Sequence, residues 1–344
     1  MLHFTRIFIF ISIFSSRLHG AESLGHKYNT YVNKAELAIV ESDYSDALRL
    51  YENAFQNTKI EFSVDVYNAC VCAIKLGQTK KLLFFADRLA AKGVGRNFFK
   101  KKIFQNYIND KDFFKILEKA EKTKNENFEM NESYTKKMDS FFSLDSLYNR
   151  IRLTKYSSYA DLPDTLETLF KKNTLNLLDF IKTNGYYSEN KLGTYVIEDT
   201  IIRVKSKPDI VFLHYLEMGR DKVISNAIKN VLLDNLNLGN IKQYHIASTI
   251  ELTSGLFNYT GSFLYNIFDC KLYKINEQQR LEEINLNRDA YCMDSISDFE
   301  KKIIFKYSRI SDFDFRYIII KAPVHDKTYF EESYHQIATI ENCN

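Results

Sequence analysis

The chain has 344 residues, of which 45% are hydrophobic, 26% charged and 15% aromatic, and it contains only 3 Pro and 11 Gly. This composition is typical of a globular protein and excludes disordered, collagen-like and multi-span membrane chains. The 47 Lys and Arg residues nearly balance the 44 Asp and Glu residues, so charge gives no reason to expect a nucleic-acid partner. At roughly 150 residues per domain the length predicts about two domains, and the scarcity of Pro and Gly favours helices.

The N-terminal segment 1–21 has the layout of a secretory signal peptide. A basic start precedes the mainly apolar run 7–14, and small residues lie near a cleavage position at Gly20 or Ala21. The apolar run is shorter than the roughly 20 residues that a membrane-spanning helix needs. We therefore expect a protein exported to the bacterial periplasm or secreted, with no transmembrane span after cleavage. The alternative is a buried first helix or an uncleaved anchor, because an arginine and a histidine precede the expected cut.

Five cysteines occur at positions without a repeated spacing, which argues against a disulfide framework. Cys70 and Cys72 lie two residues apart in a helical segment, where successive side chains rotate by about 100°. They therefore point to different sides, and we expect both to be buried as apolar side chains rather than to bind a metal. In an exported protein Cys270 could pair with Cys292, although no spacing argument brings them together.

Residues 29–123 show a repeating helical pattern. In the first unit, a break at Ser42 is followed by Ala47, Tyr51 and Ala54 at helical spacing. Thirty-five residues later Gly77 takes the place of Ser42, Leu82 of Ala47, Ala86 of Tyr51 and Leu89 of Ala54. A weaker third repetition covers 98–107 and 112–120.

This pattern resembles the tetratricopeptide repeat family, whose unit is a 34-residue helix hairpin. Small residues at these positions permit close approach of helices, and aromatic side chains fill the gaps between hairpins. The resemblance implies a concave surface that binds a peptide or protein. An ordinary helical bundle with coincidental spacing is the alternative.

The charged segment 118–137 is poor in apolar residues and is typical of a domain boundary or a solvated helix. We expect a linker between two domains at 122–138. A second domain, 139–305, and a tail, 306–344, follow it. Hydrophobic spacing and start and stop residues predict helices at 139–155, 161–185, 208–218, 221–239 and 241–254, a small hairpin at 195–204 and a strand at 313–320. The sequence thus predicts a mainly α fold, in which α-helical hairpin repeats precede a helical domain with a small β-hairpin and a C-terminal strand.

Sequence motifs for common enzyme classes are missing. Gly93-Val94-Gly95 lacks the third glycine of a dinucleotide-binding turn and follows a helix rather than a strand. The sequence contains no glycine-rich lysine loop, paired-histidine zinc helix or nucleophile elbow. We therefore expect no cofactor and no metal.

The middle of the second domain contains a His, an acidic residue, a glycine-containing turn and an Arg in this order: His214, Glu251, the turn 255–262 and Arg288. Their spacing resembles a bacterial domain family of unknown function, over about residues 139–305. In that family the turn reads Gly-x-x-Gln-x-Tyr-Gly-Thr-Gln, and an Asp is usual where this chain has Glu251. Asn258, Thr260, Ser262 and Phe263 depart from the family pattern, so a family activity, if there is one, could be lost here.

These residues suggest one polar pocket. His214 would act as a base or proton donor near neutral pH, Glu251 would orient it, and Arg288 would hold an anionic group. The pocket would be lined by Gly255, Asn258, Gly261 and Ser262. Structural roles are the alternative for each, since a lone His in an apolar helix is often a core residue, Glu251 and Arg288 could form a buried ion pair, and the turn could simply end a helix.

Two functions follow from these expectations. The first is an exported protein-interaction or scaffold protein that binds a protein or peptide on the helical-repeat surface, with no nucleic-acid partner. The second is a hydrolase-like enzyme that uses the His/Glu/Arg pocket.

Overall fold

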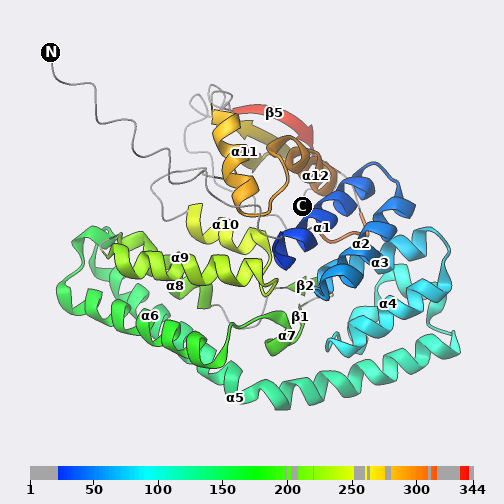
Figure 1. Ribbon diagram of the computed structural model, residues 1–344, viewed down its shortest axis with the longest axis horizontal. Coiled ribbons are helices and arrows are strands. Elements are labelled where there is room, and N and C mark those ends of the chain that lie inside the picture. The colour runs from blue at the N-terminus through cyan, green and yellow to red at the C-terminus, as the bar shows by residue number, and fades with distance from the viewer. Residues whose placement is uncertain are drawn as a thin grey trace.

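The computed structural model describes residues 22–197, 200–202, 208–219, 221–251, 260–261, 264–275, 280–308, 311–315 and 334–340. The chain is mainly helical, with a small antiparallel sheet that includes a C-terminal strand, which confirms the predicted fold class (Figure 1). Among the described residues, no helix is both long and apolar enough to cross a membrane.

Two helix hairpins open the described chain. They consist of α1 (Leu24–Val40), α2 (Tyr44–Thr58), α3 (Ser63–Lys75) and α4 (Thr79–Ala91). Ser42 and Gly77, which the sequence places at equivalent positions, have nearly the same left-handed φ, 64° and 66°. The next N–H in each hairpin also makes the same bond, from Asp43 to the carbonyl of Ala38 and from Gln78 to the carbonyl of Ala73. The 35-residue correspondence therefore extends to the backbone of the turns.

A third hairpin does not form in the same way. Two short 3₁₀ helices, η1 (Arg96–Lys100) and η2 (Lys102–Tyr107), lie where its first helix was expected. Phe98, Phe99 and Phe104 are all buried in one aromatic cluster with Phe113. Adjacent residues such as Phe98 and Phe99 point about 100° apart on an α-helix, so the tighter winding lets both rings reach the same core.

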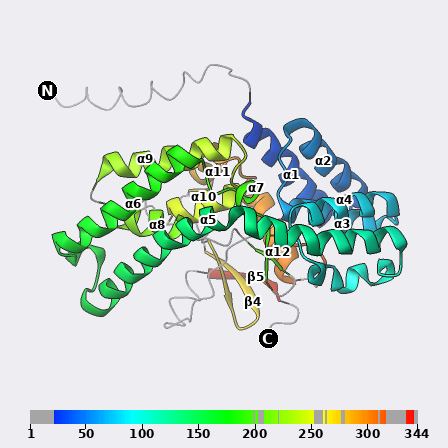
Figure 2. The same ribbon diagram turned by 90° about the horizontal axis from the view of Figure 1, so that it is seen from below.

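The segment 122–138, where we expected a linker, is helical, because α5 (Lys111–Lys155) runs through it as one helix. No Gly or Pro occurs between Gly95 and Pro163, so nothing in the sequence ends the helix there. The first turns of α5 contribute Phe113 and Ala120 to the core of the hairpins. Further along the same helix, Met138 is buried in a second core. Figure 2 shows α5 crossing the molecule between the two groups of helices.

The helices of the second core begin and end close to the predicted residues. They are α6 (Asp164–Asn184), α7 (Glu189–Leu192), α8 (Pro208–Met218), α9 (Lys222–Asn237) and α10 (Gln243–Glu251). Gly185, at φ 79°, ends α6, and the carboxylate of Asp221 accepts bonds from two N–H groups at the start of α9. The predicted hairpin is present as β1 (Tyr195–Ile197) paired with β2 (Thr200–Ile202), and its turn lies outside the described residues.

A third core lies under the small sheet. Strands β3 (Tyr265–Phe268), β4 (Lys271–Ile275) and β5 (Tyr334–Thr339) pair antiparallel in that order, and helices α11 (Leu281–Ala290) and α12 (Ile296–Ser308) accompany them. The sequence analysis did not predict β3, β4, α11 or α12. It placed the C-terminal strand at 313–320, but residues 313–315 have no regular structure and 316–320 lie outside the described residues.

The two halves of the chain pack against each other through α1. This helix contacts both α9 and α12, as Figure 1 shows. A Cβ at Gly25 would overlap the carbonyl oxygen of Leu236 in α9. Only glycine permits this approach, so α1 fits directly against the backbone of the second core.

Candidate functional site

His214 lies in α8 and faces α5. Its Nδ1 is 2.7 Å from Oδ2 of Asp145, whose side chain is 0% exposed, whereas the His214 side chain is 15% exposed. The sequence analysis expected Glu251 to orient this histidine and did not identify Asp145. The two residues are 69 positions apart, and no local spacing signal connects them.

Further polar groups surround this pair. Arg152 lies over the ring of Tyr159 at 4.4 Å and donates from Nε to Asn149 at 2.8 Å. Burial raises the pKa of Asp145, and His214 offsets part of this effect. With Nδ1 engaged, Nε2 is the ring nitrogen left for acid–base chemistry. The described residues thus provide a carboxylate-oriented histidine.

Arg288 lies in a different cluster, beneath the sheet. It is 1% exposed, its guanidinium donates to the carbonyl of Thr260 at 2.8 Å and to Oδ1 of Asp294 at 3.1 Å, and it stacks 4.4 Å from the ring centroid of Phe299. A guanidinium engaged and buried in this way fixes the chain around α11 and is closed to an external anion. The partner of Arg288 in the described part of the chain is Asp294, which the sequence did not indicate.

Of the other predicted pocket residues, Glu251 is the last residue of α10. Gly255, Asn258 and Ser262 lie outside the described residues. Gly261 has φ 69°, and a Cβ there would meet side chains of Ile284 and Ile296. This glycine therefore serves the third core, because only a residue without a side chain fits its conformation and its surroundings.

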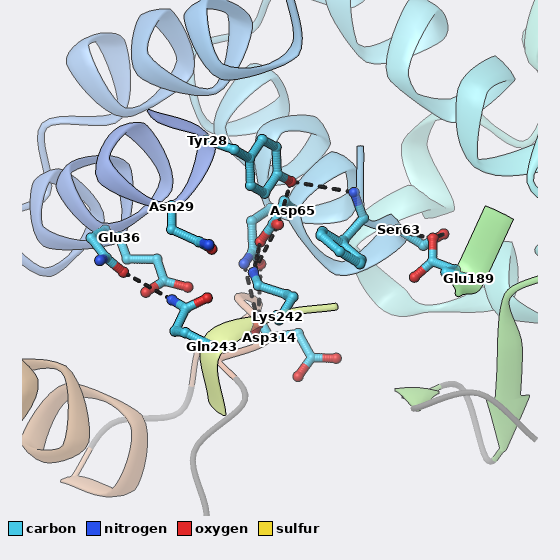
Figure 3. Close-up of polar contacts among 12 residues, drawn as sticks. Tyr28, Asn29, Glu36, Ser63, Asp65, Glu189, Lys242, Gln243 and Asp314 are labelled. Atoms are coloured by element: carbon cyan, nitrogen blue, oxygen red, sulfur yellow. Dashed lines mark hydrogen bonds and ion pairs between the residues drawn. The ribbon is translucent and has the colours of Figure 1, made fainter. Parts of the chain in front are cut away.

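The largest group of buried polar residues connects the hairpins to the rest of the chain. We call it the docking face: Asn33 and Glu36 of α1, and Ser63, Asp65, Tyr67 and Asn68 of α3, all of them buried. Figure 3 shows that Glu36, Ser63 and Asp65 point toward side chains from later parts of the chain. Buried polar groups need such partners, because a buried group without one costs free energy.

At the centre of the docking face, Asp65 binds Lys242. The Lys242 ammonium lies 2.6 Å and 2.8 Å from the two carboxylate oxygens, and Tyr28 donates its hydroxyl to the same carboxylate at 2.6 Å (Figure 3). Burial raises the pKa of Asp65, and the positive charge of Lys242 opposes this effect. Residues separated by 177 positions thus share one enclosed ion pair.

A second buried cation lies nearby. The ammonium of Lys302, in α12, is 2.8 Å from Glu36 of the docking face and 2.8 Å from Asp294. Burial opposes ionisation of Asp294, but Lys302 and Arg288 outweigh it and hold the pKa of Asp294 below its ordinary value. For Lys302, burial lowers the pKa, and the two carboxylates raise it by more. This cluster joins α1, α11 and α12.

The start of α3 makes a third set of contacts. The N–H and hydroxyl of Ser63 both donate to Oε1 of Glu189, at 2.8 Å and 2.6 Å, and the hydroxyl also contacts Thr194. Lys92 lies 3.2 Å from the same carboxylate oxygen. Phe62 precedes α3 without a side-chain cap, so Glu189 supplies the acceptor from outside the hairpins.

The last part of the docking face binds a segment of the chain without regular structure, residues 311–315. Tyr67 donates its hydroxyl to the carbonyl of Asp312 at 2.7 Å. The side-chain amide of Asn68 donates to the carbonyl of Asp314 at 3.1 Å and accepts from its N–H at 2.9 Å. Two side chains of α3 therefore recognise the main chain of this segment.

An apolar groove lies apart from the docking face, between α6 and α9. Its volume is about 610 Å³, and its lining includes Leu175, Leu178, Ile181, Val231 and Leu238. Leu175 and Leu238 are among the exposed large hydrophobic residues of the chain.

The cysteines agree with one expectation, the burial of Cys70 and Cys72, and not with a pair between Cys270 and Cys292. Cys70 and Cys72 are buried free thiols in α3, and burial raises the pKa of both. Cys292 is also a free thiol, whereas Cys270 is disulfide-bonded, so the two do not pair with each other. In the described part of the chain, no three His, Cys, Asp or Glu side chains are grouped to hold a metal ion.

Comparison of the chain with protein-family models, curated proteins and solved structures finds no match. The function therefore has to be argued from the geometry of the chain itself.

Proposed function

We propose that this chain is an exported protein-interaction scaffold, whose helical hairpins bind an extended segment of a partner protein on the docking face. The observation that supports this proposal most directly is the binding of residues 311–315 by Tyr67 and Asn68. An amide that bonds both the N–H and the carbonyl of one residue recognises an extended backbone independently of its sequence.

The distribution of the acid–base candidates favours binding over hydrolysis. His214 pairs with Asp145, whereas Arg288 is enclosed by Asp294 and Thr260. The expected hydrolytic site needs His214 and Arg288 at the same substrate. The docking face, by contrast, already makes the contacts that peptide binding requires.

Partner capture from extracts of the native host tests this function. The bait is the full chain with Asp312→Asn and Phe313→Ala. These changes weaken the binding of residues 311–315 to the docking face, and both lie at positions that are not fully buried. Adding Asn68→Ala removes both hydrogen bonds of the side-chain amide. We expect this loss to cost about 1.4 kcal/mol of binding free energy. Such a loss corresponds to a tenfold lower affinity, so capture should fall about tenfold.

The matched control adds Asn57→Ala instead, the same change at an exposed position of α2. It is expected to leave capture unchanged. Equal recovery of all proteins by the Asn68→Ala and Asn57→Ala baits would contradict the proposed function.

Export is the second part of the proposal. The disulfide at Cys270 supports it, because disulfides persist mainly in oxidising compartments. Helix α1 begins at Leu24 and is capped by Ser23, so cleavage near Gly20 or Ala21 would leave it intact. We expect N-terminal sequencing of the protein from its host to begin at or next to Ala21. An N-terminus that still starts with Met1 would count against cleavage.

A further inference from the structure

The contacts of residues 311–315 divide into two kinds. Tyr67 and Asn68 contact the main chain of Asp312 and Asp314, which any sequence could provide. The side chains of the segment make separate contacts, and these depend on its sequence, Ser-Asp-Phe-Asp-Phe. The side-chain contacts therefore determine which other segments would fit the same place.

Acidic and aromatic side chains each have a complementary partner here. Asp312 pairs with Lys75 at 2.6 Å, and Phe313 stacks on Tyr44 with ring centroids 5.7 Å apart. Phe315 is buried against Phe305, with centroids 5.4 Å apart. Acidic and aromatic residues thus alternate along the segment, whose chain bends at Asp312 and Phe313.

A second cation, besides Lys75, lies near the residues that contact the segment. Lys101 is 4.5 Å from the ring centroid of Tyr67 and 4.6 Å from that of Phe98. Lys101 beside Tyr67 and Lys75 at the end of α3 are thus two cations near the residues that contact the segment, which favours a segment that contains carboxylates.

The ion pair that the segment makes is more solvent-accessible than the central ion pair of the docking face. The side chains of Lys75 and Asp312 are 38% and 42% exposed, whereas those of Lys242 and Asp65 are 4% and 0% exposed. An exposed ion pair contributes little, typically 0–1 kcal/mol, so another segment could replace this one at lower cost than it could break the buried pairs.

From these contacts we infer that α3 and α2 form a binding site for a partner segment in which acidic and aromatic residues alternate, and that residues 311–315 are its internal ligand. This inference rests on the proposed function and specifies the chemistry of the partner. A partner with such a segment competes with residues 311–315 for Tyr67, Asn68, Lys75 and Tyr44.

The experiment uses a fluorescent synthetic peptide with the sequence of residues 309–317 and the purified full chain. Fluorescence anisotropy measures peptide binding to wild type, to the Asp312→Asn/Phe313→Ala variant and to this variant with Asn68→Ala added. We expect at least tenfold tighter binding to the double variant than to wild type, because its own segment competes less. Addition of Asn68→Ala is expected to reverse this gain, whereas Asn57→Ala is not.

A second peptide, with Asn in place of both aspartates and Ala in place of both phenylalanines, tests the chemistry. It is expected to bind the double variant at least tenfold more weakly than the first peptide. Equal binding of the two peptides, or no gain in the double variant while circular dichroism shows it folded, would overturn the inference. Host partners that still depend on Asn68 would then leave the proposed function standing with a different partner sequence.

Discussion

Replacement of Lys302 by Met is expected to lower the free energy of unfolding by about 3–5 kcal/mol, because it leaves buried carboxylates without their cation. Lys302 is 0% exposed, and its ammonium lies 2.8 Å from both Glu36 and Asp294. Urea unfolding followed by circular dichroism measures the effect. The loss should affect the whole fold, since these residues join α1, α11 and α12.

The neighbouring residue provides a matched control. Lys301 pairs only at the surface with Asp298, at 3.0 Å, and its side chain is 52% exposed. Lys301→Met is expected to change the free energy of unfolding by less than about 0.5 kcal/mol. Similar losses in the two variants would show that the buried cluster does not stabilise the fold.

The Lys302→Met effect should also depend on pH. The pKa of Asp294 is lowered in the folded protein from its ordinary value of 3.8. Its contribution to stability is therefore present above about pH 4 and is lost as the pH falls through the folded pKa. We expect the difference between wild type and Lys302→Met to be largest near pH 7 and to narrow in acid.

Replacement of Asp65 by Asn is expected to cost about 3–5 kcal/mol of unfolding free energy as well, because the Lys242 ammonium would stay buried without a counter-charge. This ammonium now contacts both carboxylate oxygens of Asp65. Thermal or urea unfolding measures the loss. Adding Lys242→Met to Asp65→Asn removes the unpaired charge, so the double variant should recover most of the lost stability.

An ion pair at the surface with the same N–O distance provides the control for Asp65→Asn. Lys119 and Asp87 also lie 2.6 Å apart, but their side chains are 43% and 47% exposed. Asp87→Asn is expected to cost no more than about 1 kcal/mol. If Asp65→Asn costs as little as Asp87→Asn, or if Lys242→Met fails to recover stability, the buried pair does not have the role described here.

Local signals predicted much of the helical architecture. Asp221 and Gly239 bound α9, and Pro208 begins α8 as predicted, because capping and stop residues act within one or two turns of the helix they bound. The equivalence of Ser42 and Gly77 was visible for the same reason. Where local signals were weak, the prediction failed, as with strands β3 and β4 and helices α11 and α12.

The candidate site was less predictable than the helices. The sequence identified His214 and Arg288 as chemically notable, but it did not identify Asp145 and Asp294 as their partners. Asp145 lies 69 residues from His214 and on another helix. The residues of the docking face were not singled out either, since buried and exposed polar residues look alike in a sequence.

The amino-acid sequence by itself determined the helical class, the equivalent turns at Ser42 and Gly77 and the ends of several helices, because these depend on residues a few positions apart. Only the tertiary structure decided which polar residues meet. Asp65 contacts Lys242 across 177 residues, and Glu36 contacts Lys302 across 266. Such pairs form because burial of the surrounding apolar core encloses the charged groups, and enclosed charges require partners wherever the chain provides them.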